Sequence, residues 1–169
     1  MLKSIDPAIK HEAISIIANL EPLPPIVLES TTLLELVNIL YSSNNALINS
    51  VLFALDHICF HSVSSIQTLF RMGLDKALIH LDFNDATLHV PILILITTLA
   101  ADVQPSYQYF FEGVQKTLAT EKYLSCSNAD LVMEFLIRSK YYGELPSMVV
   151  HTARMDNRYY LRALSVCLW

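Results

Sequence analysis

Two histidines four residues apart are the most direct candidates for chemistry in this sequence. His57 and His61 bound the segment His-Ile-Cys-Phe-His. On a helix they would share one face, whereas Cys59 between them would point elsewhere. Imidazoles at this spacing can bind Zn²⁺, but no second ligand pair with zinc spacing follows them. We therefore expect no metal ion and no cofactor, and we expect these histidines to line a groove or to cap a helix.

Asp82 and Asp85 could act as paired carboxylates in acid–base catalysis. However, they fall between two apolar stretches, in a turn where Asp is common because its side chain hydrogen-bonds to the backbone. The chain has only 3 Gly, and it contains neither a glycine-rich phosphate loop nor a Gly-x-Ser-x-Gly elbow. We therefore expect that the protein is not an enzyme.

The C-terminal part of the sequence is basic and rich in tyrosine. Residues 138–169 hold 5 basic and 2 acidic residues, whereas residues 1–137 hold 6 basic and 14 acidic ones. A basic, aromatic patch can bind nucleic acid, but the net charge of −5 favours a solvated helix face or a subunit contact. The residues concerned are Arg138, Lys140, Arg154, Arg158, Arg162, Tyr141, Tyr142, Tyr159 and Tyr160.

The overall composition is that of a folded chain of about one domain. Of the 169 residues, 53% are hydrophobic and 16% are charged, which excludes intrinsic disorder. The longest uncharged apolar run, 90–101, is about half of the ~20 residues that a membrane helix needs, so we expect no membrane association. The three cysteines Cys59, Cys126 and Cys167 show no paired spacing. They fit buried thiols in a reducing compartment better than a disulfide framework.

An internal repeat organises these residues. Residues 4–20 and 42–58 align without a gap at an offset of 38, and the pattern returns after 41 residues at 84–99 and after another 41 at 127–139. In the first two segments a polar residue, Asp6 or Asn44, precedes apolar residues at helical spacing, which predicts an N-capped helix. Period-2 alternation is missing, so the apolar stretch 91–96 is predicted to be a buried helix with Pro91 in an early turn.

Two glycines follow the same period. Gly73 and Gly113 are 40 residues apart, and each is predicted to end one helix in the left-handed conformation and let the next begin. Two or three helices in about 40 residues are typical of armadillo and HEAT repeats; an irregular helical bundle is the alternative. We expect an all-α, right-handed α-solenoid forming a single domain over 1–169.

This domain is predicted to contain about four repeats. Their approximate bounds are 1–29, 30–72, 73–113 and 114–169. A repeat cannot bury its own apolar face, and neither end of the array carries an evident polar cap. Self-association through these apolar ends is therefore a further expectation.

Residues 4–142 resemble the middle-to-late armadillo repeats of the importin-α (karyopherin-α) family. The similarity lies in the proline-rich link Glu-Pro-Leu-Pro-Pro-Ile at 21–26, in the helix that follows at 33–40, and in His-Val-Pro-Ile-Leu at 89–93. The resemblance implies a concave groove that binds nuclear localisation signals, which are Lys/Arg-rich peptides. In that family each third helix presents a Trp and, four residues later, an Asn to the peptide. The indoles hold basic side chains through cation–π contacts, and the Asn amides bind the peptide backbone.

Carried onto this chain, the Trp/Asn pairs become four other pairs. They are Ser15/Asn19, Phe53/His57, Ile94/Thr98 and Phe135/Ser139. Asn19 alone keeps the family residue, while Phe53 and Phe135 keep an aromatic ring. The resemblance therefore implies that Asn19 holds the peptide backbone and that the two phenylalanines hold the stems of Lys or Arg.

The implied partners are basic segments of nuclear cargo proteins, with the protein acting in the cytoplasm and nucleus. The family also binds importin-β and an export receptor. Importin-β is recruited through a basic N-terminal arm, whereas Lys3 and Lys10 are the only basic residues among the first 70, so coupling to that receptor is not expected. The alternative function is an armadillo scaffold or assembly factor that has lost signal binding.

Overall fold

The structure, a computed structural model, describes residues 2, 6–101, 107–124 and 127–140. Within them the regular elements are helices and none is a strand, which confirms the predicted all-α class. No helix among these residues is both long enough and apolar enough to cross a membrane. Our expectations for Cys126, Cys167, the residues beyond 140 and the repeat end at 150–169 fall outside the described part.

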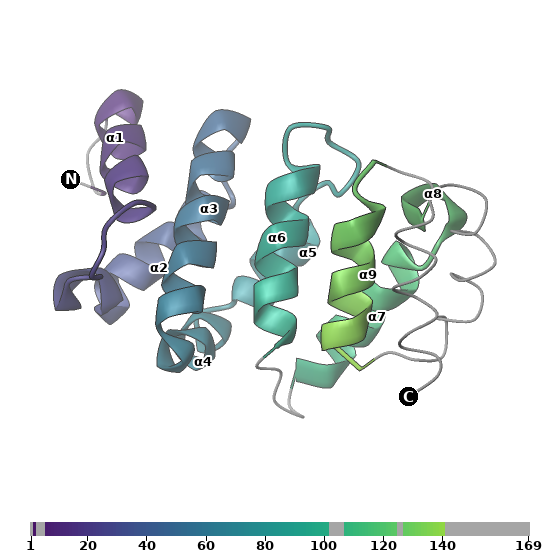
Figure 1. Ribbon diagram of the computed structural model, residues 1–169. Helices are drawn as coiled ribbons and strands as arrows, with labels where there is room; N and C mark the ends of the chain where they lie inside the picture. Colours follow the sequence, from purple (N-terminus) through teal and green to yellow (C-terminus); the bar gives the residue numbers. More distant parts are fainter. Residues whose placement is uncertain (1, 3–5, 102–106, 125–126, 141–169) are drawn as a thin grey trace. The chain divides into compact units, whose positions relative to one another are not determined.

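The helices follow one another in groups of three, and we call the members of each group its first, second and third helix (Figure 1). In the described residues, the groups that follow α1 begin at Pro25, Val63 and Gln108; the expected bounds of the repeats stay a prediction. The elements are α1 (Pro7–Ile17), η1 (Pro25–Leu28), α2 (Ser30–Ile39), α3 (Asn45–His61), α4 (Val63–Arg71), α5 (Leu74–His80), α6 (His89–Ala100), α7 (Gln108–Leu118), α8 (Glu121–Leu124) and α9 (Ala129–Arg138).

The chain forms two compact units that divide within α6. The first unit is Met1–Thr98 and the second is Leu99–Trp169. In the first unit α3 packs against α1, α2 and α4, and α5 packs against α2 and α4. In the second unit α8 packs against α9.

Both predicted helix caps are present. The Asp6 carboxylate accepts a hydrogen bond from the backbone N–H of Ala8 at 2.8 Å, and Asn44 Oδ1 accepts one from the N–H of Leu47 at 3.1 Å. Each bond satisfies a backbone donor that has no partner within the helix. Two of the repeated segments therefore begin their helices as the sequence predicts.

Helix α3 supplies much of the apolar core of the first unit. Its side chains Val51, Leu52, Leu55 and Ile58 have no exposed surface. Complete burial of such a side chain contributes about 1.5–3 kcal/mol. Helix α6 is also buried over Ile92–Ile96, apart from Ile94, and this confirms a buried helix where a strand was the alternative. Pro91 lies in its first turn, where a missing N–H costs no helical bond.

Asp82 and Asp85 organise the turn between α5 and α6. Asp82 Oδ1 accepts a hydrogen bond from the backbone N–H of Asn84 at 2.8 Å. Asp85 Oδ1 accepts bonds from the N–H and the hydroxyl of Thr87, at 2.8 and 2.6 Å. The Thr87 hydroxyl is the main cause that lowers the pKa of Asp85 below its ordinary value. Both aspartates therefore cap the turn, as expected.

The two glycines have different roles. Gly73 has φ = 90° and precedes α5, which confirms the predicted left-handed junction. The same prediction for Gly113 is wrong, because this residue lies inside the continuous helix α7. The flanking residues Phe110, Phe111 and Val114 are buried on one face of α7, and this burial favours a continuous helix despite the low helix propensity of glycine.

Replacing each glycine by alanine should therefore change stability in opposite directions. No atom lies within 4 Å of an added Cβ at either position, so only backbone conformation matters. We expect Gly73→Ala to destabilise by about 1–2 kcal/mol, the cost of a left-handed non-glycine residue. Gly113→Ala should stabilise by about 0.5–1 kcal/mol. Urea denaturation measures both; effects of the same sign would contradict the two assignments.

Candidate functional site

Hydrogen bonds to the α1 segment fix one flank of α3. The Ser50 hydroxyl lies 3.0 Å from Nε2 of His11 on α1. Farther along α3, Nε2 of His57 lies 2.9 Å from the backbone oxygen of Leu20. Because a carbonyl oxygen only accepts, this ring nitrogen of His57 carries the proton.

The opposite flank of α3 is bonded to α6 and the turn before it. Asn45 donates to the Asp85 carboxylate at 2.6 Å, and Asn49 donates to the Thr87 carbonyl at 3.1 Å. The Thr98 hydroxyl donates to Asp56 at 2.6 Å. The five bonds on the two flanks join residues 37 to 42 positions apart in the sequence, which is the period of the repeat.

The predicted groove residues of the first unit define a partly exposed surface, which we call the ladder face. We define it by six of the predicted groove residues, two from each of three segments of the first unit: Ser15 of α1 and Asn19 just after that helix, Phe53 and His57 of α3, and Ile94 and Thr98 of α6. Ser15, His57, Ile94 and Thr98 are half-buried, Asn19 is exposed, and 43% of Phe53 is exposed. Phe60, seven residues after Phe53 and thus on the same side of α3, is 73% exposed.

Some polar side chains of the ladder face already form hydrogen bonds within the protein. The Asn19 side-chain nitrogen donates to the carbonyl of Ser15 at 2.7 Å, and His57 and Thr98 make the flank bonds described above. A peptide backbone would have to share or replace these partners. The exposed ring of Phe53 is apolar, so a peptide can contact it without replacing an existing hydrogen bond.

The ladder face carries acidic groups. Burial raises the pKa of Asp56, while the Thr98 hydroxyl and the neighbouring His57 act in the opposite direction. Glu12, three residues before Ser15 on α1, is exposed. Glu21 is also exposed, and its carboxylate lies 3.3 Å from Nε2 of His61. The surface around Phe53 therefore combines aromatic and acidic side chains.

In the fourth predicted pair, Phe135 and Ser139, the phenylalanine does not line an open groove, and this part of the prediction is wrong. Phe135 has no exposed surface, and its ring stacks on Phe111 of α7 with centroids 5.9 Å apart. Ser139 accepts a bond from the side chain of the buried residue Gln115 at 2.5 Å and donates to the Leu136 carbonyl. In the second unit Phe111 of α7 packs against Phe135, so Phe135 belongs to its core, whereas Ser139 is half-buried.

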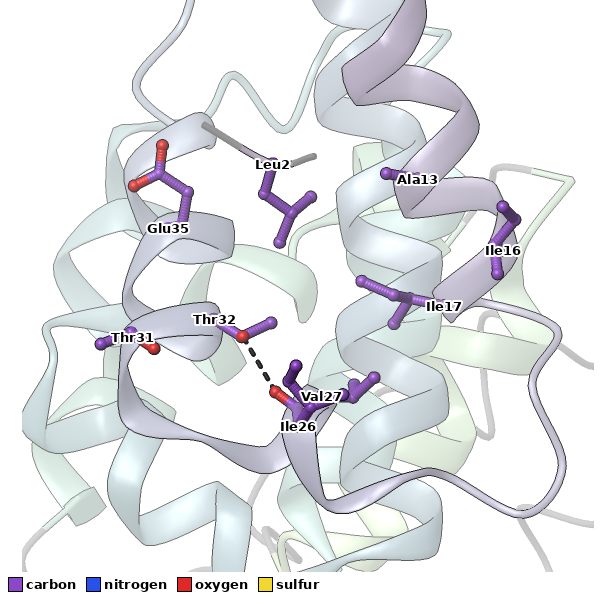
Figure 2. A pocket seen from close by; sticks show the side chains of 9 residues that line it. All are labelled: Leu2, Ala13, Ile16, Ile17, Ile26, Val27, Thr31, Thr32 and Glu35. Atoms are coloured by element: carbon purple, nitrogen blue, oxygen red, sulfur yellow. Dashed lines mark hydrogen bonds between the residues drawn. The ribbon is translucent and has the colours of Figure 1, made fainter. Parts of the chain in front are cut away.

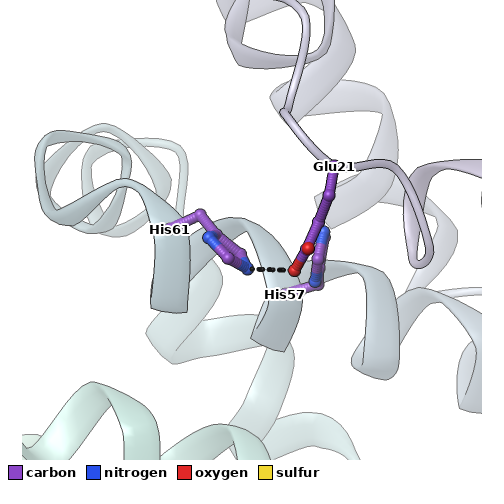
Figure 3. Close-up of side chains that lie close together, drawn as sticks. All are labelled: Glu21, His57 and His61. Atoms are coloured by element: carbon purple, nitrogen blue, oxygen red, sulfur yellow. Dashed lines mark ion pairs between the residues drawn. The ribbon is translucent and has the colours of Figure 1, made fainter.

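Glu21 comes together with both histidines of α3. Figure 3 shows the three side chains pointing toward one another, His57 and His61 from the helix and Glu21 from the segment after α1. One ligand atom of each lies within 4.8 Å of the others, and the two imidazole centroids are 4.5 Å apart. Cys59 is buried, which confirms that it points away from this pair.

A separate apolar pocket of about 480 Å³ lies between α1, η1 and α2 (Figure 2). The Thr32 hydroxyl inside it donates to the Ile26 carbonyl at 2.9 Å. Ile16 and Ile26 are 46% and 64% exposed. The pocket therefore exposes apolar side chains to solvent. Self-association of the protein through this apolar surface stays a prediction. Its lining residues are Leu2, Ala13, Ile16, Ile17, Ile26, Val27, Thr31, Thr32 and Glu35.

Comparison with known proteins identifies the type of fold. No protein-family model matches the chain, and no curated protein matches it. Among solved structures, an engineered protein from the Northeast Structural Genomics Consortium aligns with 99% of this chain and 74% of its own, at a TM-score of 0.76 and 15% identity.

Two designed armadillo repeat proteins align as well. One, solved in complex with the peptide (KR)4, has a TM-score of 0.65 and 19% identity over 98% of this chain and 66% of its own. The other has a TM-score of 0.68 and 16% identity over 98% of this chain and 84% of its own. The fold is an armadillo-like helical repeat. At these identities the comparisons show the fold alone, and they do not single out the importin-α family.

The armadillo arrangement also reveals residues that the sequence argument overlooked. Phe60 could have been found from its seven-residue spacing to Phe53, and Asp56 from its offset of 42 residues to Thr98. Glu21 gives no such signal, because it lies in the irregular link between α1 and η1. Only the packing of that link against α3 brings its carboxylate to the histidines.

Phe53 and Phe135 occupy equivalent positions of their third helices but should differ in their effect on stability. We expect Phe135→Ala to cost about 3–5 kcal/mol, because it leaves a cavity in the core of the second unit. Phe53→Ala should cost less than about 1.5 kcal/mol, since its ring is partly exposed already. Thermal unfolding followed by circular dichroism compares the two variants; equal losses would show that Phe53 is a core residue too.

Proposed function

We propose that the ladder face binds an extended, Lys/Arg-rich peptide segment. The observation that carries the proposal is the exposed ring of Phe53, on a helix whose flanks are hydrogen-bonded and which carries the acidic residue Asp56 three positions later. An aromatic face attracts the charge of Lys or Arg and packs against its apolar stem. The acidic groups around it favour basic over neutral peptides.

The armadillo fold supports a peptide as the partner in general, since a designed armadillo repeat protein has been solved with the peptide (KR)4. The resemblance in sequence supports the finer proposal that the natural peptides are nuclear localisation signals of cargo proteins, bound in the cytoplasm and nucleus. In this proposal the protein acts by binding and not as an enzyme.

A second candidate function is a scaffold that does not bind signal peptides. It is supported by the hydrogen bonds that residues of the ladder face already form within the protein. His57 bonds to Leu20, Thr98 to Asp56, and Asn19 to Ser15. A groove whose polar groups are already paired gains less from a peptide backbone, because every new bond replaces an existing one.

Titration of a fluorescent (KR)4 peptide separates the two functions. The control is a peptide of equal length in which Glu alternates with Lys, so that the net charge is zero. We expect saturable binding of (KR)4 that weakens with added salt, since exposed charges are screened. Equal anisotropy curves for the two peptides would favour the scaffold.

The ring of Phe53 should set the affinity for the basic peptide. We expect Phe53→Ala to weaken binding by about 0.5–2 kcal/mol, and Phe53→Trp to strengthen it because indole is the better cation–π partner. Tyr41→Ala is the matched control, since Tyr41 is 49% exposed but its ring lies 5.6 Å from His80 of α5. If the surface binds the peptide only through its negative charge, the affinity should still fall with added salt, but neither Phe53 variant should change it.

Asn19 should contribute through its side-chain amide. We expect Asn19→Ala to weaken binding of (KR)4 by about 1–3 kcal/mol, the cost of a peptide backbone group left unpaired. Asn19→Asp tests the same position with an added charge and should lose less affinity, because Asp still accepts a hydrogen bond and attracts basic side chains. If both variants bind like the original protein, Asn19 is not part of the groove.

A further inference from the structure

We propose that Glu21, His57 and His61 form a Zn²⁺-binding site that joins the segment after α1 to helix α3. Two imidazole nitrogens and one carboxylate oxygen are an established donor set for Zn²⁺, with water completing the shell. The site lies at the end of α3 and shares His57 with the ladder face, but it does not include Phe53. It is separate from the apolar pocket beside α1.

The spacing of the three groups suits a zinc ion. Zn–N and Zn–O bonds of about 2.0–2.1 Å at tetrahedral angles place neighbouring ligand atoms about 3.3 Å apart. Nε2 of His61 and Oε1 of Glu21 are 3.3 Å apart, and a ring nitrogen of His57 completes a set within 4.8 Å. Exposed Glu21 and His61 side chains, at 70% and 36%, can close the remaining distance by small rotations.

One ring nitrogen of His57 is already held by a hydrogen bond. Its Nε2–H donates to the Leu20 carbonyl at 2.9 Å, so in the neutral ring Nδ1 keeps a free lone pair for a metal ion. Metal-binding histidines characteristically donate their other N–H to a carbonyl or carboxylate, which fixes the ring. Here the peptide turn that supplies this carbonyl continues directly into Glu21. One short segment therefore provides both the support for one ligand and a second ligand.

The surroundings favour a cation that has no hydrolytic role. In zinc peptidases with two histidines at this spacing, a Glu directly after the first histidine acts as general base. Ile58 stands at that position here and has no exposed surface. The inferred ion therefore clamps the link between α1 and η1 onto α3, where the protein without metal has the hydrogen bond from His57 to Leu20 and an exposed ion pair of little stabilising value.

Metal titration of the purified chain tests the site, after treatment with a chelator. We expect one equivalent of Zn²⁺ by calorimetry and the visible spectrum of tetrahedral Co²⁺ when Co²⁺ replaces it. His61→Gln and Glu21→Gln should each weaken Zn²⁺ binding by more than the roughly 10-fold that loss of a supporting residue costs. Both residues are on the surface, and circular dichroism verifies that the variants fold.

His80→Gln is the matched control, because His80 is an exposed histidine on α5 whose ring lies beside Tyr41. It should bind Zn²⁺ like the original chain. Zn²⁺ should also raise the melting temperature of the original chain and of His80→Gln, but not of His61→Gln or Glu21→Gln. Three variants with the same affinity as the original chain, or no stoichiometric binding to any of them, would overturn the proposal.

Discussion

The first unit depends on the burial of α3 by helices from neighbouring repeats. Its residues Val51, Leu52, Leu55 and Ile58 are completely covered, and α1, α2 and α4 contribute to that cover. A helix as short as α1, with 11 residues, is marginal by itself in water. In a repeat protein each unit gains its stability from contacts with the next, so the apolar layer decides where every exposed residue of α3 can lie.

The hydrogen bonds on the two flanks of α3 add little to this stability, because most involve exposed groups and a typical bond contributes about 0.5–1.5 kcal/mol net. Their value lies in register. Bonds from His11, Asn45 and Asn49 connect residues about one repeat apart, so each successive third helix is held at a defined height and rotation. The exposed ring of Phe53 is therefore presented at a fixed place, and a binding partner does not have to order it first.

Local signals in the sequence predicted the features that depend on a few neighbouring residues. Asp6 and Asn44 cap helices, and Gly73 has a positive φ, because cap and turn preferences act within one helical turn. Gly113 and Phe135 were assigned by analogy with the repeat, and both assignments fail because of packing in the second unit. There, Phe111 of α7 packs against Phe135, and the burial of Phe110, Phe111 and Val114 favours a continuous α7.

Prediction of the candidate site from the sequence has the same limit. The pair Phe53 and His57 could be located from its position in the repeat, and His57 and His61 from their helical spacing. Glu21 could not, because an irregular link has no period, and its direction depends on the carbonyl of Leu20 meeting His57. Functional groups that reach a helix from such links are revealed only when the tertiary contacts are known.

The register of α3 also determines where the chain can tolerate a change in length during evolution. Each residue added to an α-helix turns everything after it by about 100°. One insertion between Asn49 and Phe53 would therefore move the ring off the exposed stripe and break the bonds of Asp56 and His57 to their neighbours. The turn between α5 and α6 can absorb an extra residue more easily, provided that Asp85 and Thr87 still reach Asn45 and Asn49. Length variation among related sequences should therefore concentrate between the helices and spare the interior of α3.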